Sequence, residues 1–149
     1  MATINISTYI KAPIERCFDL ARDIDFHSKS VAHTGERAVA GTISGLIGPG
    51  EEVTWEAKHI CVRQRFTVRI TAFERPTYFQ DIMIRGAFKT FVHDHRFAPS
   101  SEGTLMTDEL TFHSPFWLVG TFVDLIFIKR YLQRLIEMRC DAIKQAAER

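Results

Sequence analysis

Two histidines in the middle of the chain, His93 and His95, have residue types and a spacing suited to acid–base or metal-binding chemistry. They belong to a stretch in which Phe91 and Phe97 continue the same two-residue step. Alternate residues of a β-strand share a face, so both imidazoles and both phenyl rings are predicted to lie on one side of a strand. A polar pair among large apolar side chains indicates that this side faces inward.

Two carboxylates occupy similar positions in neighbouring strand candidates. The apolar residues at the matching alternate positions are Phe79 and Met83 around Asp81, and Met106, Leu110 and Phe112 around Asp108. Burying an unpaired carboxylate costs several kcal/mol, so Asp81 and Asp108 are expected to need partners. The candidate partners are His93, His95 and His59.

Four interpretations of this group remain open. It is a polar network that braces the sheet, or the polar end of an apolar pocket that holds a ligand's head group. It is an acid–base site in which His93, His95 or Asp108 moves a proton during an aldol-type cyclisation or dehydration. It is a zinc site built on the histidine pair and a carboxylate, although no other spacing supports a metal. Nucleophilic catalysis lacks a GxSxG or cysteine signature, so no catalytic residue is assigned with certainty.

The main element that must position these residues is a long C-terminal helix, predicted over Asp124–Glu148. Apolar residues recur there at three- and four-residue steps with polar residues between them, and the stretch contains no Gly or Pro. This pattern is typical of a helix with one face against the rest of the protein.

The preceding chain reads mostly as strands. Thr3–Ile10 alternates as a strand, Pro13 begins a helix with Cys17, Phe18 and Ala21 on its apolar side, and Phe26–Ser30 suggests a short helix and loop. Six further strands are expected, at Glu36–Ile43, Glu52–Ile60, Val62–Phe73, Tyr78–Arg85, Phe88–Phe97 and Thr104–Phe112. A turn is expected over Ala98–Gly103 and a short helix over Phe116–Val123. Short connections favour antiparallel pairing. The inward face of Val62–Phe73 is expected to carry Phe66, Val68, Ile70 and Ala72, unless a bulge, expected near Gly86, inverts it.

Composition narrows the functional classes. The chain of 149 residues fits one domain, 1–149, and its net charge of +1 gives nucleic-acid binding no electrostatic support. The three cysteines, Cys17, Cys61 and Cys140, form no CxxC pair and favour a reducing, cytoplasmic setting. The apolar segment Phe116–Ile128 is too short for stable membrane insertion. A monomer or homodimer is expected.

Several motifs together resemble a known superfamily. They are Ala12–Glu15 with Phe18, Glu51–His59, Phe73–Pro76 with Phe79–Asp81, Arg85–Phe88, His93–Phe97 and Gly103–Asp108. The chain resembles START/Bet v 1-like (SRPBCC) proteins, whose bacterial members are often described as polyketide cyclase/dehydrase-type ligand-binding proteins. The resemblance implies an α+β helix-grip fold. In that fold a curved antiparallel sheet of about six to seven strands wraps around the C-terminal helix, two short helices follow the first strand, and an apolar cavity is enclosed.

The function expected from these features is binding or sequestration of a hydrophobic or amphipathic small molecule, lipid-, polyketide- or isoprenoid-like, without a metal or other cofactor. The alternative is a cyclase or dehydratase that acts on a polyketide-like substrate through His/Asp acid–base chemistry. A third possibility is a protein-interaction or membrane-surface module that uses Phe116–Ile128. The expected ligand-binding residues are Trp55, His59, Phe66, Phe79, Asp81, Met83, Phe91, His93, His95, Asp108, Leu110, Phe112, Phe122, Phe127 and Tyr131.

Overall fold

The computed structural model of the chain describes residues 1–59, 62–115 and 122–149. The elements in chain order are β1 (Ala2–Ile10), α1 (Ile14–Ala21), α2 (Ile24–Ser30), the 3-10 turn η1 (Ala32–Thr34), β2 (Arg37–Gly41), β3 (Glu52–His59), β4 (Val62–Glu74), β5 (Tyr78–Arg85), β6 (Phe88–Ser100), β7 (Gly103–Pro115) and α3 (Phe122–Ala147). The predicted order of one strand, two short helices, six strands and a long helix is confirmed. The short helix expected over Phe116–Val123 falls largely outside the described residues, as does the first part, 116–121, of the segment invoked for partner or membrane binding.

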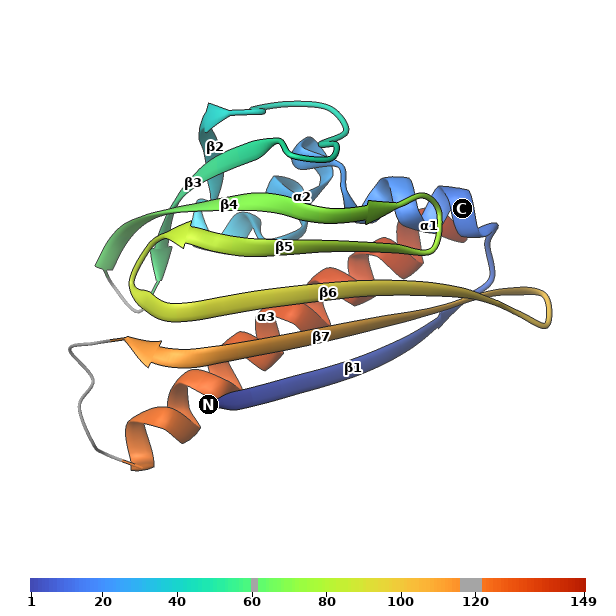
Figure 1. Cartoon of the computed structure of the whole chain (residues 1–149). Coiled ribbons are helices and arrows are strands. Elements are labelled where there is room, and N and C mark those ends of the chain that lie inside the picture. Colours follow the sequence, from blue (N-terminus) through green and yellow to red (C-terminus); the bar gives the residue numbers. More distant parts are fainter. Residues whose placement is uncertain (60–61, 116–121) are drawn as a thin grey trace.

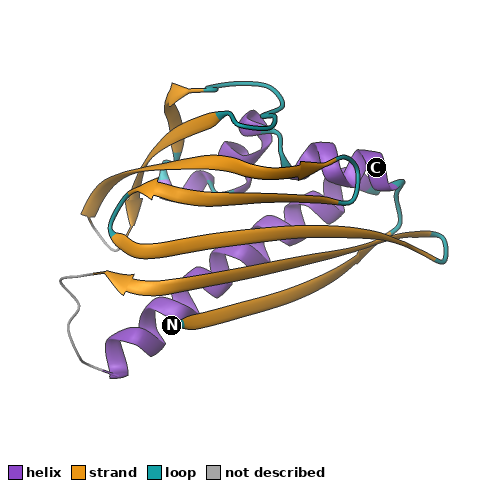
Figure 2. Cartoon of the chain, in the orientation of Figure 1, coloured by secondary structure: helices purple, strands orange, loops and turns teal. Residues whose placement is uncertain are grey.

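The strands form one antiparallel sheet of seven strands, in the order β1-β7-β6-β5-β4-β3-β2. Strands β2 to β7 pair with their neighbours in sequence because short connections allow nothing more distant, while β1 closes the far edge on β7. Helix α3 crosses one face of the curved sheet, and α1 and α2 lie towards one end (Figures 1 and 2). This arrangement is the helix-grip fold that the resemblance implied.

The register of β5, β6 and β7 brings the chemically active residues together. Asp81 of β5 lies opposite His93 of β6, and His95 of β6 lies opposite Asp108 of β7. Because directly opposite residues of paired strands point to the same face, all four side chains project from one side of the sheet. The alternation used for the prediction therefore holds across these three strands.

At Thr71 the alternation of inward and outward residues along β4 is reversed. The β4–β5 register shifts between Ile70 and Ala72, which leaves Thr71 as an extra residue in β4. Phe73 then packs against the core, edge-on to Phe18 with ring centroids 5.4 Å apart. The prediction that Ala72 continues the inward face was wrong, since a bulge moves later residues to the other face. A second register shift lies between Thr67 and Val68, opposite the end of β5, close to the position expected near Gly86.

The β6–β7 hairpin is longer than predicted. Pairing continues through Pro99↔Thr104 to Ser100↔Gly103, so the turn takes only Ser101 and Glu102. Ser101 adopts a positive φ of 42°, which is what a tight two-residue hairpin connection requires. The six-residue turn expected over Ala98–Gly103 was an overestimate because Pro99 does not end the strand.

The C-terminal end of α3 is fixed to the start of the chain. The Arg16 guanidinium donates to the carbonyl oxygens of Ala147 at 2.9 Å and Ala146 at 2.8 Å. Lys144 Nζ donates to the Tyr9 carbonyl at 2.6 Å. The Arg16 bonds satisfy carbonyls that a helix end leaves without intrahelical partners and join α3 to α1. The Lys144 bond joins α3 to β1.

The space between sheet and helix is divided into a packed half and a hollow half. Near α1 it is filled by Phe18, whose ring contacts Phe73, Phe79 and Phe97 edge-on, and by Cys140, Ile143 and Ala147 of α3. Towards the other end the side chains of α3 border a cavity. Phenylalanines contribute to both halves, since Phe66 and Phe91 line the cavity. No helix among the described residues is both long and apolar enough to cross a membrane.

Candidate functional site

A cavity of about 230 Å³ lies between the sheet and α3. Its walls are mostly apolar, and α3 contributes Ile128, Tyr131, Leu132, Leu135, Ile136 and Arg139. These positions follow the three- and four-residue steps of one helix face. The volume is below the 300–1,000 Å³ typical of drug-sized ligand pockets, so the cavity suits a compact ligand.

Four ionisable side chains form a continuous hydrogen-bonded chain on the sheet. Asp81 Oδ2 lies 2.8 Å from His95 Nε2, and His95 Nδ1 lies 2.9 Å from Asp108 Oδ1. The same Asp108 oxygen lies 2.9 Å from His93 Nε2. We call Asp81, His95, Asp108 and His93 the His–Asp chain. The prediction that Asp81 and Asp108 need histidine partners is confirmed for His93 and His95, whereas the side chain of the third candidate, His59, falls outside the described residues.

His95 is the positively charged member of this chain. Each of its ring nitrogens faces a carboxylate oxygen, and an ionised carboxylate only accepts hydrogen bonds, so both nitrogens carry protons. Burial lowers the pKa of His95, but the hydrogen bonds to Asp108 and Asp81 outweigh burial and raise the pKa. The imidazolium is therefore held between two negative charges.

The other three members respond to the same charges. Burial raises the pKa of Asp108, yet hydrogen bonds from His93 and His95 bring it well below its ordinary value. The pKa of Asp81 is also lowered, because the bond from His95 outweighs its burial. Burial and the nearby charge of His95 lower the pKa of His93. A neutral His93 donates from Nε2 to Asp108 and keeps the lone pair on Nδ1.

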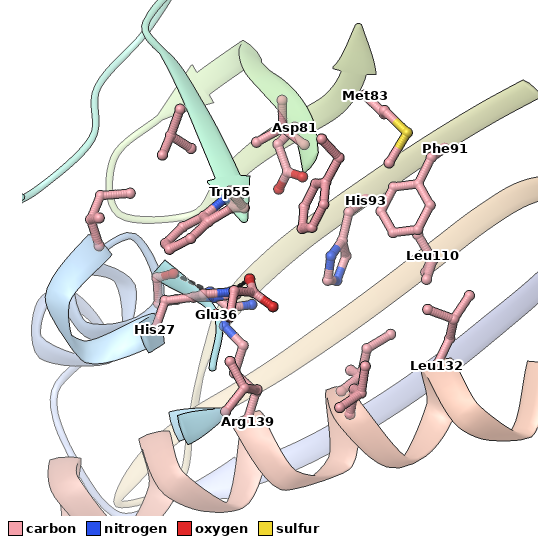
Figure 3. A pocket seen from close by; sticks show the side chains of 18 of the residues that line it. His27, Glu36, Trp55, Asp81, Met83, Phe91, His93, Leu110, Leu132 and Arg139 are labelled. Carbon is pink, nitrogen blue, oxygen red and sulfur yellow. Dashed lines mark hydrogen bonds and ion pairs between the residues drawn. The ribbon is translucent and has the colours of Figure 1, made fainter. Parts of the chain in front are cut away.

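The two end residues of the His–Asp chain border the cavity, and its two middle residues lie behind the cavity wall. Asp81 and His93 are among the residues that line the cavity, and both point from the sheet towards α3 (Figure 3). His95 and Asp108 are each only 2% exposed and do not line it. Cys140 Sγ of α3 lies 3.4 Å from Asp108 Oδ2 and covers the chain from the helix side.

A second polar group borders the cavity between α2 and the start of β2. His27 Nε2 lies 2.6 Å from Glu36 Oε1, and the His27 ring packs on Trp55 with centroids 4.5 Å apart. Burial, followed by the negative charge of Glu36, raises the pKa of the Tyr131 hydroxyl. The cavity therefore carries polar groups at two places on an otherwise apolar wall (Figure 3).

Sequence reasoning missed His27, Glu36 and Arg139 as cavity residues. Nothing in the local pattern of α2 or of the loop before β2 marks His27 and Glu36, because their meeting depends on the tertiary fold. Arg139 had a signal, since it continues the apolar stripe of Leu132 and Leu135 by one further helical step. A charged residue at a stripe position points inward.

The residues predicted to bind a ligand divide into four groups. Those that line the cavity are Trp55, Phe66, Phe79, Asp81, Met83, Phe91, His93, Leu110 and Tyr131. His95, Asp108 and Phe112 are buried behind the wall, where Phe112 packs edge-on against Phe88 with centroids 5.6 Å apart. Phe127 is 55% exposed and does not line the cavity, because its neighbour Ile128 takes the inward position of the helix. The side chains of His59 and Phe122 fall outside the described part of the chain.

The histidines also meet a geometric requirement for metal binding. Asp81, His93 and His95 each offer a ligand atom, and these atoms lie within 4.8 Å of one another. Asp108 would then accept a hydrogen bond from the other ring nitrogen of His95. Carboxylates accept such bonds from metal-ligating histidines in many metalloproteins. A metal ion would have to displace the proton between His95 Nε2 and Asp81 Oδ2, which are already in hydrogen-bond contact.

Comparison with solved structures identifies the same fold in other proteins. TTHA0849 from Thermus thermophilus has a TM-score of 0.78 at 19% identity, over 97% of this chain and 95% of that one. The ginseng major latex-like protein 151 from Panax ginseng has a TM-score of 0.70 at 14% identity, over 98% and 97% of the two chains. The di-domain ARO/CYC StfQ from the steffimycin biosynthetic pathway has a TM-score of 0.79 at 13% identity, over 98% of this chain and 50% of that one. At these identities the likeness concerns the fold.

Comparison of sequences identifies the family to which this chain belongs. Among curated proteins the search finds no match. A family described as "Polyketide cyclase / dehydrase and lipid transport" matches residues 1–148. The match spans almost the whole chain and agrees with the helix-grip fold and the enclosed cavity. The chain therefore belongs to the polyketide cyclase/dehydrase and lipid transport family.

Proposed function

We propose that the protein binds a hydrophobic or amphipathic small molecule, lipid-, polyketide- or isoprenoid-like, in the cavity between the sheet and α3, and that residues 1–149 act as one ligand-binding domain. The observation that carries this proposal is an apolar cavity with polar groups, Asp81 and His93, at one place on its wall. Small-molecule sites are commonly built in this way, with apolar walls for affinity and a few polar groups for orientation.

The apolar wall supplies the driving force. Removing apolar surface from water contributes about 25 cal/mol per Å², so a ligand that buries ~300 Å² gains roughly 7 kcal/mol before entropy costs. The polar groups add selectivity, because a ligand that reaches Asp81 and His93 without matching them leaves buried polar atoms unpaired. Sequestration needs no chemical step.

Native mass spectrometry on gently purified protein tests the proposal directly, with the mass of the denatured protein as control. We expect a non-covalent adduct of up to a few hundred daltons that disappears on denaturation. The adduct should also be lost from a Leu132→Phe variant, in which a larger side chain occupies the cavity. A protein that shows no adduct and binds no apolar probe on titration would contradict the proposal.

A second candidate function is cyclisation or dehydration of a polyketide-like substrate. The observation that favours it is the His–Asp chain, which begins at Asp81 and ends at His93, both on the cavity wall. A neutral His93 with a free lone pair could remove a proton from a carbon between two carbonyl groups, while Asp108 stabilises the imidazolium that forms. The carbanion would then attack a second carbonyl, and the His93 imidazolium would return its proton to the alkoxide that forms. Loss of the resulting hydroxyl as water, together with a proton from the neighbouring carbon, would follow.

The two functions separate in turnover measurements on a poly-β-keto substrate. If the protein is a cyclase, His93→Gln and Asp108→Asn should each lower kcat by about 100-fold or more and alter the pH–rate profile. Unchanged turnover in both variants, with binding intact, would exclude acid–base catalysis by the His–Asp chain. Sequestration alone predicts no turnover in the native protein.

A cytoplasmic location is also part of the proposal. Cys17 and Cys140 are both free and buried, as expected of thiols in a reducing compartment. Burial and the nearby Asp108 carboxylate raise the pKa of the Cys140 thiol, which keeps it protonated and unreactive.

A further inference from the structure

The outer face of the sheet, which points away from α3, carries a cluster of cations around one carboxylate. The carboxylate of Glu56 in β3 accepts hydrogen bonds from Arg65 at 2.8 Å, Arg37 at 3.1 Å and Arg63 at 3.2 Å. The Glu56 side chain is only 8% exposed, whereas each of the three arginine side chains is at least 68% exposed. One carboxylate cannot neutralise three guanidinium groups, each of which has five N–H donors. Positive charge and unused donors therefore face the solvent.

Two further cations extend this cluster on the same face. Lys58 of β3 lies opposite Arg63 of β4, and Arg85 of β5 lies opposite Thr67 of β4. In β4, Arg63 and Thr67 alternate with Phe66, which lines the cavity, so these two residues and their cross-strand partners project outward. Lys58 and Arg85 are both exposed. We call the five cations the basic surface: Arg37, Lys58, Arg63, Arg65 and Arg85.

The basic surface is a local excess of charge in a nearly neutral chain. The net charge is +1, so five cations around a single carboxylate leave the rest of the chain with a net negative charge. Further along the same strands Arg69 pairs with Glu52 at 2.7 Å, which balances the charge there. A molecule polarised in this way attracts and orients a negatively charged partner at one face.

The surroundings of the basic surface favour a membrane as that partner. Val62, the first residue of β4, is 56% exposed beside Arg63, where β3 and β4 connect (Figure 1). An anionic bilayer offers phosphate groups to guanidinium groups and an apolar layer to a protruding apolar side chain. Nucleic acids and acidic polypeptides match the charge but have no apolar layer. Clusters of about four to eight Lys and Arg residues are typical of proteins that bind anionic lipids.

We propose that the basic surface docks the protein peripherally on membranes that contain anionic phospholipids, with lipid phosphates bound by its arginines. This surface lies on the sheet and is distinct from the Phe116–Ile128 segment considered from the sequence. Docking needs no molecule in the cavity, so the proposal goes beyond the binding function and does not depend on it. It would bring a cavity with apolar walls close to the phase in which apolar molecules dissolve.

Sedimentation with lipid vesicles measures docking of the full chain. Vesicles of phosphatidylcholine with about 30% phosphatidylglycerol should bind at least about 20-fold more tightly than vesicles of phosphatidylcholine alone at low salt. Raising NaCl from about 20 to about 150 mM should weaken this binding about tenfold or more, because salt screens exposed charges. Inorganic phosphate at matched ionic strength should weaken it no more than NaCl does.

Variants locate the docking surface. Lys58→Gln and Arg85→Gln leave the bonds to Glu56 intact, and each should weaken binding to the anionic vesicles about fivefold. Glu56→Gln removes the central negative charge and should strengthen binding by about the same factor, which loss of structure would not do. Arg149→Gln is the matched control, since it removes one positive charge at the C-terminus, at the other end of the molecule (Figure 1). Its binding should stay within about twofold of native.

Each other outcome would overturn the proposal in a recognisable way. Equal binding to both kinds of vesicle, or equal losses in Arg149→Gln and Lys58→Gln, would show that the basic surface does not dock on membranes. Competition by inorganic phosphate beyond the effect of NaCl would identify a site for free phosphate. Binding of poly-L-glutamate without binding of vesicles would assign the surface to an acidic protein. Leu132→Phe, which fills the cavity, should dock normally, and failure of the cavity to bind a ligand would leave the docking result unchanged.

Discussion

At the scale of single residues, Asp108 joins three elements. From β7 it accepts hydrogen bonds from His93 and His95 of β6, and it lies 3.4 Å from Cys140 Sγ of α3. Its carboxylate is 2% exposed, so its charge is compensated by these partners rather than by water. Whether the cavity binds or catalyses, its polar end depends on this one side chain.

Replacing Asp108 by Asn should destabilise the protein by about 3 kcal/mol. The change leaves the buried His95 imidazolium with a single carboxylate, and breaking a buried charge pair costs about 3–5 kcal/mol. Urea unfolding should show a lower midpoint with an unchanged m-value. Asp141→Asn, at an exposed position of α3, is the control and should change stability by no more than about 0.5 kcal/mol.

The raised pKa of His95 predicts that part of the stability is lost in alkaline solution. A histidine whose pKa is higher in the folded than in the unfolded state stabilises the fold fully below the unfolded pKa of 6.5. This contribution disappears as the pH rises through the folded pKa, which lies above 6.5. The pKa of His93 is lowered, so its effect on the unfolding free energy falls below pH 6.5. The loss of stability above pH 6.5 is therefore expected to come from His95 and not from His93.

Unfolding free energies at pH 6.5 and pH 9 measure this contribution. The difference between the native protein and His95→Gln should be larger at pH 6.5 than at pH 9. His113→Gln, at the end of β7 outside the His–Asp chain, serves as the control for a general effect of losing a histidine. A difference that stays constant or grows with pH would show that His95 is not the imidazolium.

Metal removal should leave the protein unchanged. Both nitrogens of His95 already donate to carboxylates, so an ion at Asp81, His93 and His95 would have to displace a proton held by two negative charges. We expect the same melting temperature before and after dialysis against EDTA and after addition of equimolar Zn²⁺. A rise with Zn²⁺ that is absent in His93→Gln would instead identify a metal site.

At the scale of elements, α3 changes role along its length. Six positions between Ile128 and Arg139 border the cavity, whereas Cys140, Ile143 and Ala147 belong to the packed core. The sheet changes in the same direction, because the bulge at Thr71 turns Phe73 towards Phe18 and helps to fill the space at that end. The cavity therefore ends where the aromatic cluster around Phe18 begins.

This division predicts unequal effects of truncation along α3. Ile143 is 1% exposed in the packed half, so Ile143→Ala should cost about 2–5 kcal/mol through lost burial and a new cavity. Met138 is 43% exposed on the same helix, and Met138→Ala should change stability by about 0.5 kcal/mol or less. Equal losses in thermal or urea unfolding would contradict the packing described here.

At the scale of the whole molecule, space remains between the sheet and α3 because a single helix is narrower than the sheet that it crosses. The curved sheet wraps around α3, with α1 at one end (Figure 1). Large side chains such as Phe18 fill the space at the α1 end. The remaining cavity of about 230 Å³ makes the molecule less stable than a fully packed interior would.

Filling the cavity should therefore stabilise the protein and abolish binding. Leu132 is partly buried on the cavity wall, and Leu132→Phe should raise the unfolding free energy by about 1 kcal/mol, as cavity-filling substitutions commonly do. The same variant should bind 2-ethylnaphthalene at least tenfold more weakly. A variant that is destabilised while its binding is unchanged would show that Leu132 does not face the ligand.

The sequence by itself determined the order of elements, the inward faces of β5, β6 and β7, and the need of Asp81 and Asp108 for histidine partners. Helical and strand periodicities are local properties, and a buried carboxylate needs a partner in any fold. Only the tertiary structure decided the bulge at Thr71, the exposure of Phe127 and the meeting of His27 with Glu36. It also decided which members of the His–Asp chain reach the cavity and that Arg139 Nε has no hydrogen-bond partner among the described residues. These features depend on register and on contacts between residues distant in the chain, which alternation alone does not encode.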